Sequence, residues 1–327
     1  MNIQSALTLG PEILPTNIPN IVYFIFFGII LTISGIYLVK SLSKISRFLG
    51  ISEFSAAFII MAIATSLPEL LVGISAATAG NSALSLGNVI GANILNLTIV
   101  TGIIILMGKE IKTQKKVGKD IYFMLLAISL IIILYLAGSS LSRLDGVILL
   151  LFFFFNSYRI LKKRKKYPKK TKDGNENNKR FLALITFLIA LVFLFISSNF
   201  VVTYASAIAI DFNFPQIIIG LFLISFATTL PELVFGVISG RLKHGEMGIG
   251  NQTGSVIVNS TLVLGIVSLI HPIKVATIPF LTSAIFMFIV GFIFLTFAIT
   301  GRKLEKIEGV SLILIYVLFI IIELFIK

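Results

Sequence analysis

Long apolar runs alternate with short polar segments along almost the whole chain. Each run is long enough for the roughly 20 residues with which an α-helix crosses a hydrocarbon core. The pattern therefore predicts an all-α integral membrane protein that passes through the cell membrane many times. Ten transmembrane helices are expected, at residues 20–41, 52–79, 84–107, 119–137, 144–161, 181–205, 215–240, 247–270, 277–299 and 308–326.

The composition agrees with this pattern and excludes several classes of protein. Of the 327 residues, 57% are hydrophobic and only 13% are charged, and the mean hydropathy is +1.04. A soluble enzyme or a nucleic-acid-binding module would carry far more charge. The net charge of +13 comes from basic residues in the segments between apolar runs, a distribution typical of membrane orientation and not of nucleic-acid binding.

The distribution of Lys and Arg predicts which side each segment faces. With ten spans, 24 of the 27 basic residues fall on one side of the membrane. Because basic segments stay in the cytoplasm, we expect both termini to lie outside. The segment 163–180 is polar and basic, and it is interpreted as a cytoplasmic linker between residues 1–162 and 181–327.

The two halves carry an internal repeat with an offset of 163 residues. ATSLPELLVG and GNVIGANILN, within residues 62–102, match ATTLPELVFG and GNQTGSVIVN, within residues 225–265. Between 64–102 and 227–265, 15 of 39 positions are identical. Because each half holds five spans, an odd number, the second copy enters the membrane from the opposite side. The sequence thus predicts two inverted-topology five-helix repeats, a design common among secondary transporters.

Two carboxylates lie deep within apolar runs, and they occupy equivalent positions of the repeat: Glu69 and Glu232. A charge at the centre of a bilayer costs about 3 kcal/mol on insertion scales. No Lys or Arg lies at comparable depth in any predicted span. The pair is therefore expected to take up protons, to bind a cation, or to do both.

The residues around the two glutamates are rich in oxygen donors. Pro68 and Pro231 precede the glutamates and free backbone carbonyls in their helices. Hydroxyl and amide side chains occur at equivalent positions of both halves: Thr65, Ser66 and Asn96 in the first, and Thr228, Thr229 and Asn259 in the second. Ser255 adds a hydroxyl in the second half alone, because its counterpart is Ala92. Hard cations such as Ca²⁺ prefer such oxygen ligands. Soft and borderline metals are disfavoured because the chain has no Cys and its two His residues fall in predicted loops.

At these residues the chain resembles the cation/calcium exchanger superfamily, and specifically its prokaryotic sodium/calcium exchanger branch. The resemblance implies antiport of Na⁺ and Ca²⁺ through one cluster of cation sites at the middle of the membrane. It implies that the helices at 20–41 and 181–205 slide to alternate access. It assigns Ca²⁺ ligation to Glu69, Glu232, Thr65 and Thr228, flanking Na⁺ sites to Ala62, Ser66, Ser225, Thr229 and Ser255, and the central positions to Asn96 and Asn259. Members of the superfamily often have an acidic residue at one central position, whereas both are Asn here.

We therefore expect a secondary active antiporter that exchanges Ca²⁺ for Na⁺ by alternating access. Two alternatives remain open at this stage: a Ca²⁺/H⁺ antiporter of the same fold, because buried glutamates can titrate, and a passive cation channel. No enzymatic motif occurs in the sequence, and no resident cofactor is expected. The expected partners are the transported ions and membrane lipid, without nucleic acid, and one chain is expected to form a complete pathway as a monomer.

Overall fold

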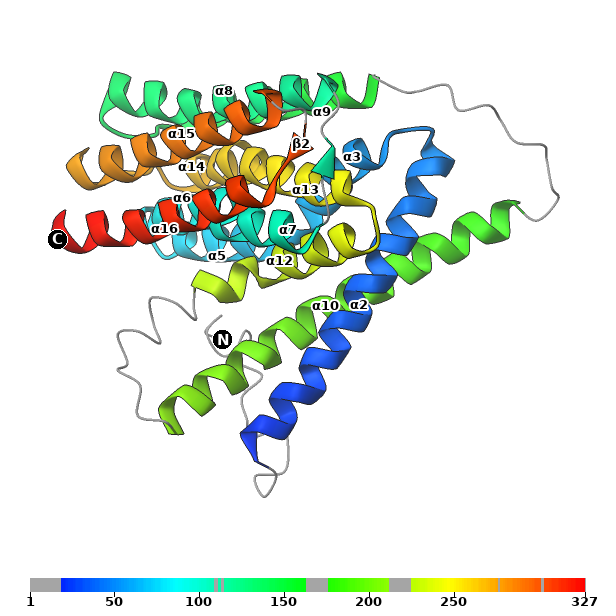
Figure 1. Cartoon of the computed structure of the whole chain (residues 1–327). Coiled ribbons are helices and arrows are strands. Elements are labelled where there is room, and N and C mark those ends of the chain that lie inside the picture. The colour runs from blue at the N-terminus through cyan, green and yellow to red at the C-terminus, as the bar shows by residue number, and fades with distance from the viewer. Residues whose placement is uncertain are drawn as a thin grey trace.

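The computed structural model of this chain is almost entirely helical (Figure 1). It describes residues 19–108, 111–112, 115–162, 176–211, 225–275, 277–300 and 303–326. In the first half the elements are α2 (Asn20–Leu49), α3 (Glu53–Ala56), η2 (Ala57–Met61), α4 (Ala62–Thr65), α5 (Leu67–Thr78), α6 (Ser82–Leu95), η3 (Asn96–Val100), α7 (Thr101–Met107), β1 (Ile111–Lys112), α8 (Lys115–Gly138) and α9 (Arg143–Lys162). In the second half they are α10 (Glu176–Asp211), α12 (Ser225–Arg241), α13 (Gly245–Ile257), η5 (Val258–Val263), α14 (Leu264–Ile270), α15 (Thr277–Thr300), β2 (Lys303–Leu304) and α16 (Lys306–Ile326).

The helices follow the predicted apolar ranges in order. Within the described residues, seven helices are long and apolar enough to cross a membrane, and an eighth span is formed if the bent pair at Glu53–Thr65 and Leu67–Thr78 is counted as one. The apolar range 215–240 is described only from Ser225. The chain is therefore a multi-pass membrane protein.

Several predicted boundaries fall short of the helix ends, because hydropathy follows only the apolar part of a helix. Helix α2 continues eight residues beyond position 41, so that Lys44 and Arg47 lie on its last turns and not in a loop. It ends at Gly50, whose φ of 66° is left-handed and favours glycine. Helix α10 begins at Glu176, within the predicted linker; the linker residues 163–175 lie outside the described residues.

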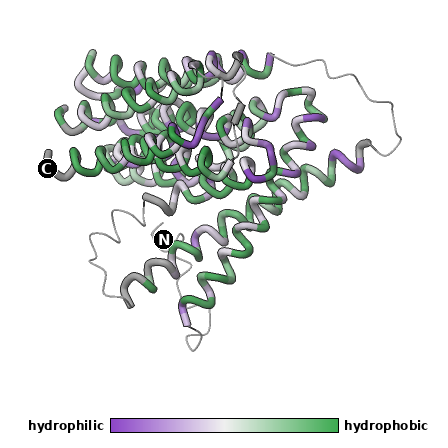
Figure 2. The backbone as a smooth tube through the Cα atoms, viewed as in Figure 1, coloured by the Kyte–Doolittle hydropathy of each residue, from purple (hydrophilic) through white to green (hydrophobic). Residues whose placement is uncertain are grey.

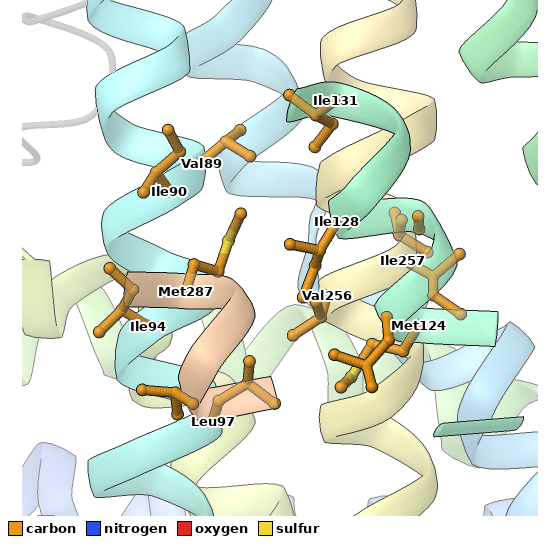
Figure 3. Close-up of a cluster of buried hydrophobic side chains, with 14 of the residues drawn as sticks. Val89, Ile90, Ile94, Leu97, Met124, Ile128, Ile131, Val256, Ile257 and Met287 are labelled. Atoms are coloured by element: carbon orange, nitrogen blue, oxygen red, sulfur yellow. The ribbon is translucent and has the colours of Figure 1, made fainter. Parts of the chain in front are cut away.

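Two helical runs form the centre of the molecule. In Ser82–Met107 and Gly245–Ile270, 78% of the most apolar window is buried, against 28–39% in the other spans. The outer helices show hydrophobic residues along their lengths (Figure 2). Figure 3 shows the apolar core between the central runs and their neighbours, where Ile94 and Val256 lie near Ile128 of α8 and Met287 of α15. This core holds the central runs in place, while exposed apolar side chains cover the outer helices.

Helices α2 and α10 pack along one another and extend away from the remaining helices (Figure 1). Aromatic rings join them: Phe27 stacks on Phe200 with 4.2 Å between ring centroids, and Tyr23 stacks on Tyr204 at 4.9 Å. At Gly35 of α2, an added Cβ would lie only 3.0 Å from a side-chain carbon of α12. The pair therefore contacts the rest of the molecule through a close approach of α2 to α12.

Contacts between connecting segments join the two halves at the ends of the helices. Strands β1 and β2 pair in an antiparallel register, with Ile111 opposite Leu304. Leu141, between α8 and α9, forms a bridge with Ile273, which follows α14. Each contact joins segments that the ten-span topology places on the same side of the membrane.

Candidate functional site

Glu69 lies in the first turn of α5, directly after a break in the helix that precedes it. The helix before Ser66 and the helix after it differ in direction by 41°. Pro68, in the first turn of α5, has no N–H to donate to the carbonyl of Ala64. The Glu69 side chain is completely buried. The proline and the bend thus place an acidic side chain and an incompletely bonded backbone beside each other inside the molecule.

Glu232 lies in the equivalent place of the second half. It follows Pro231, which lies inside α12, and its side chain is also completely buried. Because a proline inside a helix removes one backbone hydrogen bond, the carbonyl of Ala227 lacks the donor that an ordinary residue at 231 would supply. Both halves therefore present the same combination of a buried acid and a disturbed backbone.

The structure brings the two carboxylates together across the repeat. They lie close enough for the charge of Glu69 to act on Glu232. The hydroxyl of Thr228 faces Glu69, and that of Thr65 faces Glu232. Within the described part of the chain, no group donates a hydrogen bond of normal geometry to either carboxylate. Two buried acids with unpartnered oxygens form a site that a positive ion would stabilise.

Thr65 connects the bend of the first half to α13 of the second. Its hydroxyl group lies 3.1 Å from the carbonyl of Met61, 3.4 Å from Oδ1 of Asn251 and 3.4 Å from Oγ of Ser255. Asn251 and Ser255 are completely buried. Among the predicted residues, Thr65 and Ser255 are therefore in direct contact, and the hydroxyl of Thr65 faces the carboxylate of Glu232.

The predicted residues next to the threonines have different environments. Ser66 is buried and its hydroxyl has no partner among the described residues. Thr229 is also buried. Ala62 packs closely against Gly254 of α13. The backbone carbonyl of Ala62 accepts a hydrogen bond from the backbone N–H of Ser66 at 3.0 Å. Ser225 begins α12, but its side chain lies outside the described residues.

The two central asparagines lie where the helices change their winding. Asn96 is the first residue of η3, and Asn259 is the second residue of η5. These wider turns were not predicted, because the sequence favoured continuous helices over both ranges. π-Helical turns leave local backbone groups less regularly paired and occur often at functional sites. Both side chains are completely buried; the amide of Asn96 has no hydrogen-bond partner among the described residues, and Oδ1 of Asn259 has none either.

Glycines let the first half approach α13 closely. A Cβ at Gly250 would lie 2.7 Å from the carbonyl oxygen of Phe54, and a Cβ at Gly254 would collide with that of Phe58. Alanine does not fit at such distances without a shift. At Gly87 and Gly91, the equivalent positions, a Cβ would meet nothing within 4 Å. The close approach thus occurs at the two glycines of the second half and not at the two of the first.

Sequence reasoning missed Asn93, Ser260 and Gln252, which are completely buried polar residues near the site. Asn93 contacts both Ser260 and Asn259. Gln252 donates to the backbone carbonyl of Glu232 at 3.5 Å. Their repeat counterparts are apolar, so a search for residues shared by both halves passes over them. Their polarity inside very apolar helices was the available signal.

The chemistry of the site is that of a hard-cation site with few charges. Within the described residues, no three His, Cys, Asp or Glu side chains gather to hold a metal. Glu69 and Glu232 supply the negative charge, and the other donors are neutral hydroxyl, amide and carbonyl oxygens. Such a set suits ions that accept many oxygen ligands, such as Ca²⁺ or Na⁺.

Comparison with known proteins places the chain among exchangers. It is 28% identical to the sodium/calcium exchanger MaX1 of Methanosarcina acetivorans, over 92% of this chain and 98% of that protein. It is 30% identical to the putative antiporter CaxA of Alkalimonas amylolytica, over 76% of this chain and 80% of that protein. Its fold matches the sodium-calcium exchanger NCX_Mj, soaked with 2.5 mM Na⁺ and 1 mM Sr²⁺, with a TM-score of 0.81 and 26% identity, over 93% and 98% of the two chains.

The family described as "Sodium/calcium exchanger protein" matches this chain twice, at residues 19–162 and 182–325. The two matches cover nearly the whole chain. The chain therefore belongs to the sodium/calcium exchanger family of membrane transporters.

Proposed function

We propose that this protein is a secondary active antiporter that exchanges Ca²⁺ for Na⁺ at a site between its two halves. The observation that carries the proposal is the pair of completely buried carboxylates, Glu69 and Glu232, which lie near each other with unpartnered oxygens. A cation supplies the charge compensation that the described surroundings lack. Family membership and the names of the relatives support Na⁺ and Ca²⁺ as the ions.

Charge balance explains how the two ions compete. Two ionised carboxylates balance one Ca²⁺ or two Na⁺, so that the loaded site is close to neutral in either case. The empty site has a high free energy, because it carries two uncompensated charges in a low-dielectric environment. Occupied states therefore favour the movement between inward-facing and outward-facing forms, and exchange is coupled.

We assign the ligands among these oxygen donors as the resemblance to the exchanger superfamily implies. Glu69, Glu232, Thr65 and Thr228 hold Ca²⁺, the threonines through their backbone carbonyls. The central positions beside the glutamates belong to Asn96 and Asn259. Flanking Na⁺ sites use Ala62, Ser66, Ser225, Thr229 and Ser255. Close packing of Thr65 against Ser255 supports a cluster in which neighbouring sites share ligands. No resident cofactor takes part.

The topology that accompanies this function is two inverted five-helix repeats, residues 1–162 and 181–327, joined by the basic linker 163–180. The strand pair β1–β2 and the bridge between Leu141 and Ile273 support it, because each joins segments that ten spans place on one side. The basic residues favour a cell membrane orientation with both termini outside. A single chain surrounded by lipid holds both copies of the repeat and so forms the whole pathway.

Alternating access is assigned to helices α2 and α10. They pack mainly on each other and contact the rest of the molecule at one side (Figure 1). Their shared aromatic stacks, such as Phe27 on Phe200, allow them to move as one unit. Sliding of this unit over α12, which carries Glu232, would expose the site to one side of the membrane and then to the other.

Flux in proteoliposomes tests the proposal. An outward Na⁺ gradient is expected to drive uptake of ⁴⁵Ca²⁺ into vesicles that contain the purified protein. The controls replace internal Na⁺ with K⁺ or apply a pH gradient alone. Ca²⁺ uptake that does not depend on the Na⁺ gradient but depends on the pH gradient would show a Ca²⁺/H⁺ antiporter. Ca²⁺ uptake without any counter-flux of another ion would show a channel. Either result would overturn the proposal.

A further inference from the structure

Asn93 of α6 reaches across the interface between the halves and contacts two residues of η5. Its Nδ2 donates to Oγ of Ser260 at 3.0 Å, and its Oδ1 accepts from Nδ2 of Asn259 at 3.2 Å. All three side chains are completely buried. These two hydrogen bonds form a short chain that links the central run of the first half to that of the second.

The hydrogen bond from Asn259 determines which of its amide atoms remains free. Because Nδ2 is bound to Asn93, the free atom is Oδ1, which is buried and has no partner among the described residues. A neutral amide can present either an oxygen or an NH₂ group to its surroundings. Only the oxygen stabilises a cation, and an NH₂ group turned toward the ion would repel it.

The equivalent position in the other half has no such support. The repeat places Val256 where Asn93 stands and Leu97 where Ser260 stands. In agreement, both amide atoms of Asn96 lack a hydrogen-bond partner within the described residues. The two central asparagines therefore occupy equivalent positions of the repeat but differ in how their side chains are held. The Asn259 amide is oriented by a hydrogen bond, whereas the side-chain amide of Asn96 has no hydrogen bond to a described neighbour.

We propose that Asn93 is a positioning residue that turns the Asn259 amide so that its oxygen, and not its nitrogen, serves the cation site. This inference rests on the proposed function, because it assumes that a cation is bound between the halves. It assigns Asn93 no direct contact with the ion. It accounts for a site that uses an amide at a central position, since a carboxylate has two oxygens and needs no such orientation.

A double-mutant cycle between positions 93 and 259 tests the proposal by equilibrium binding of ⁴⁵Ca²⁺ to the purified protein. Asn93→Val introduces the residue found at the repeat counterpart. It is expected to weaken Ca²⁺ binding about tenfold, the effect of losing one oriented ligand. In a background of Asn259→Asp, whose two oxygens are equivalent, the same substitution is expected to change the affinity less than about twofold.

The cycle separates orientation from simple packing. If Asn93 only fills space, Asn93→Val weakens binding equally in both backgrounds, and the proposal is wrong. It is also wrong if Asn93→Val leaves the wild-type affinity unchanged. Asn93→Ser, which is too short to reach Asn259, serves the same cycle if the valine variant does not fold. Failure of the proposed function is a different result, because the wild-type protein itself would then bind no Ca²⁺.

Discussion

The hydroxyl of Thr65 lies 3.4 Å from Oδ1 of Asn251, although the two residues are 186 positions apart. Thr65 ends the helix before the bend that carries Glu69, and Asn251 lies on α13 of the second half. The bend of the first half therefore packs against α13, which belongs to the central helical run of the second half. The proposed site therefore takes residues from both halves, and a site between two related halves suits a transporter that alternates between two forms.

Removal of one buried charge tests the role of the glutamates. Glu69→Gln and Glu232→Gln are each expected to abolish Na⁺-driven Ca²⁺ uptake, because one remaining carboxylate does not balance a divalent ion. Folding should persist, since a neutral amide is cheaper to bury than an unpaired carboxylate. The measurement is ⁴⁵Ca²⁺ flux, together with the thermal midpoint of each purified variant. Normal transport by either variant would contradict the assignment.

Adding a charge at a central position is expected to change the ion preference. Asn259→Asp supplies a third carboxylate, so that the site then holds one more positive charge. The added charge favours the binding of a further monovalent ion. The Na⁺ concentration that displaces half of the bound ⁴⁵Ca²⁺ is therefore expected to fall. The matched variant Asn96→Asp places the same charge at the repeat counterpart. Unchanged Na⁺ competition in both variants would show that the central positions do not face the ions.

The glycines of the repeat offer a matched test of packing. Gly254→Ala is expected to destabilise the protein by about 1–3 kcal/mol, because the new methyl group would collide with the Phe58 carbonyl. Gly91→Ala, at the equivalent position, adds a methyl group that meets nothing within 4 Å. It should cause no loss and removes some backbone entropy from the unfolded chain. The measurement is the thermal midpoint of each variant in the same detergent. An equal decrease of the midpoint in both variants would contradict the close approach at Gly254.

Two polar contacts at the ends of the helices, an Arg–Asp ion pair and a His–Glu hydrogen bond, should differ strongly in their contribution to stability. Arg159 lies 2.7 Å from Asp120, and only 16% and 5% of these side chains are exposed. His244 lies 2.7 Å from Glu53, and about a third of each side chain is exposed, at 30% and 31%. Arg159→Met removes one charge partner of a buried carboxylate and is expected to cost about 3–5 kcal/mol. His244→Gln is expected to cost no more than about 1 kcal/mol. Thermal unfolding that ranks the two variants in the opposite order would contradict this account.

Most of the fold could be predicted because a bilayer restricts the sequence strongly. Each crossing needs a long apolar run, and a buried charge is rare enough to be noticed. For the same reason Glu69 and Glu232 could be singled out from fourteen acidic residues. The repeat added independent information, since it aligned the two glutamates and the two central asparagines without any knowledge of the structure.

The features that escaped prediction depend on contacts and not on composition. The π-helical turns η3 and η5 were not predicted, because their residues continue the apolar runs on either side without a break. The contact of Asn93 with Asn259 joins residues 166 positions apart and has no counterpart in the other repeat. The end of α2 was placed too early because Lys and Arg form helices well but lower the hydropathy.

Equilibrium binding of ⁴⁵Ca²⁺ to the purified protein tests the central claim most directly. The account predicts saturable binding of one Ca²⁺ per chain, displacement of that ion by Na⁺, and loss of binding when Glu69 and Glu232 are both replaced by glutamine. Binding of Ca²⁺ that survives the double substitution, or that Na⁺ does not displace, would contradict it.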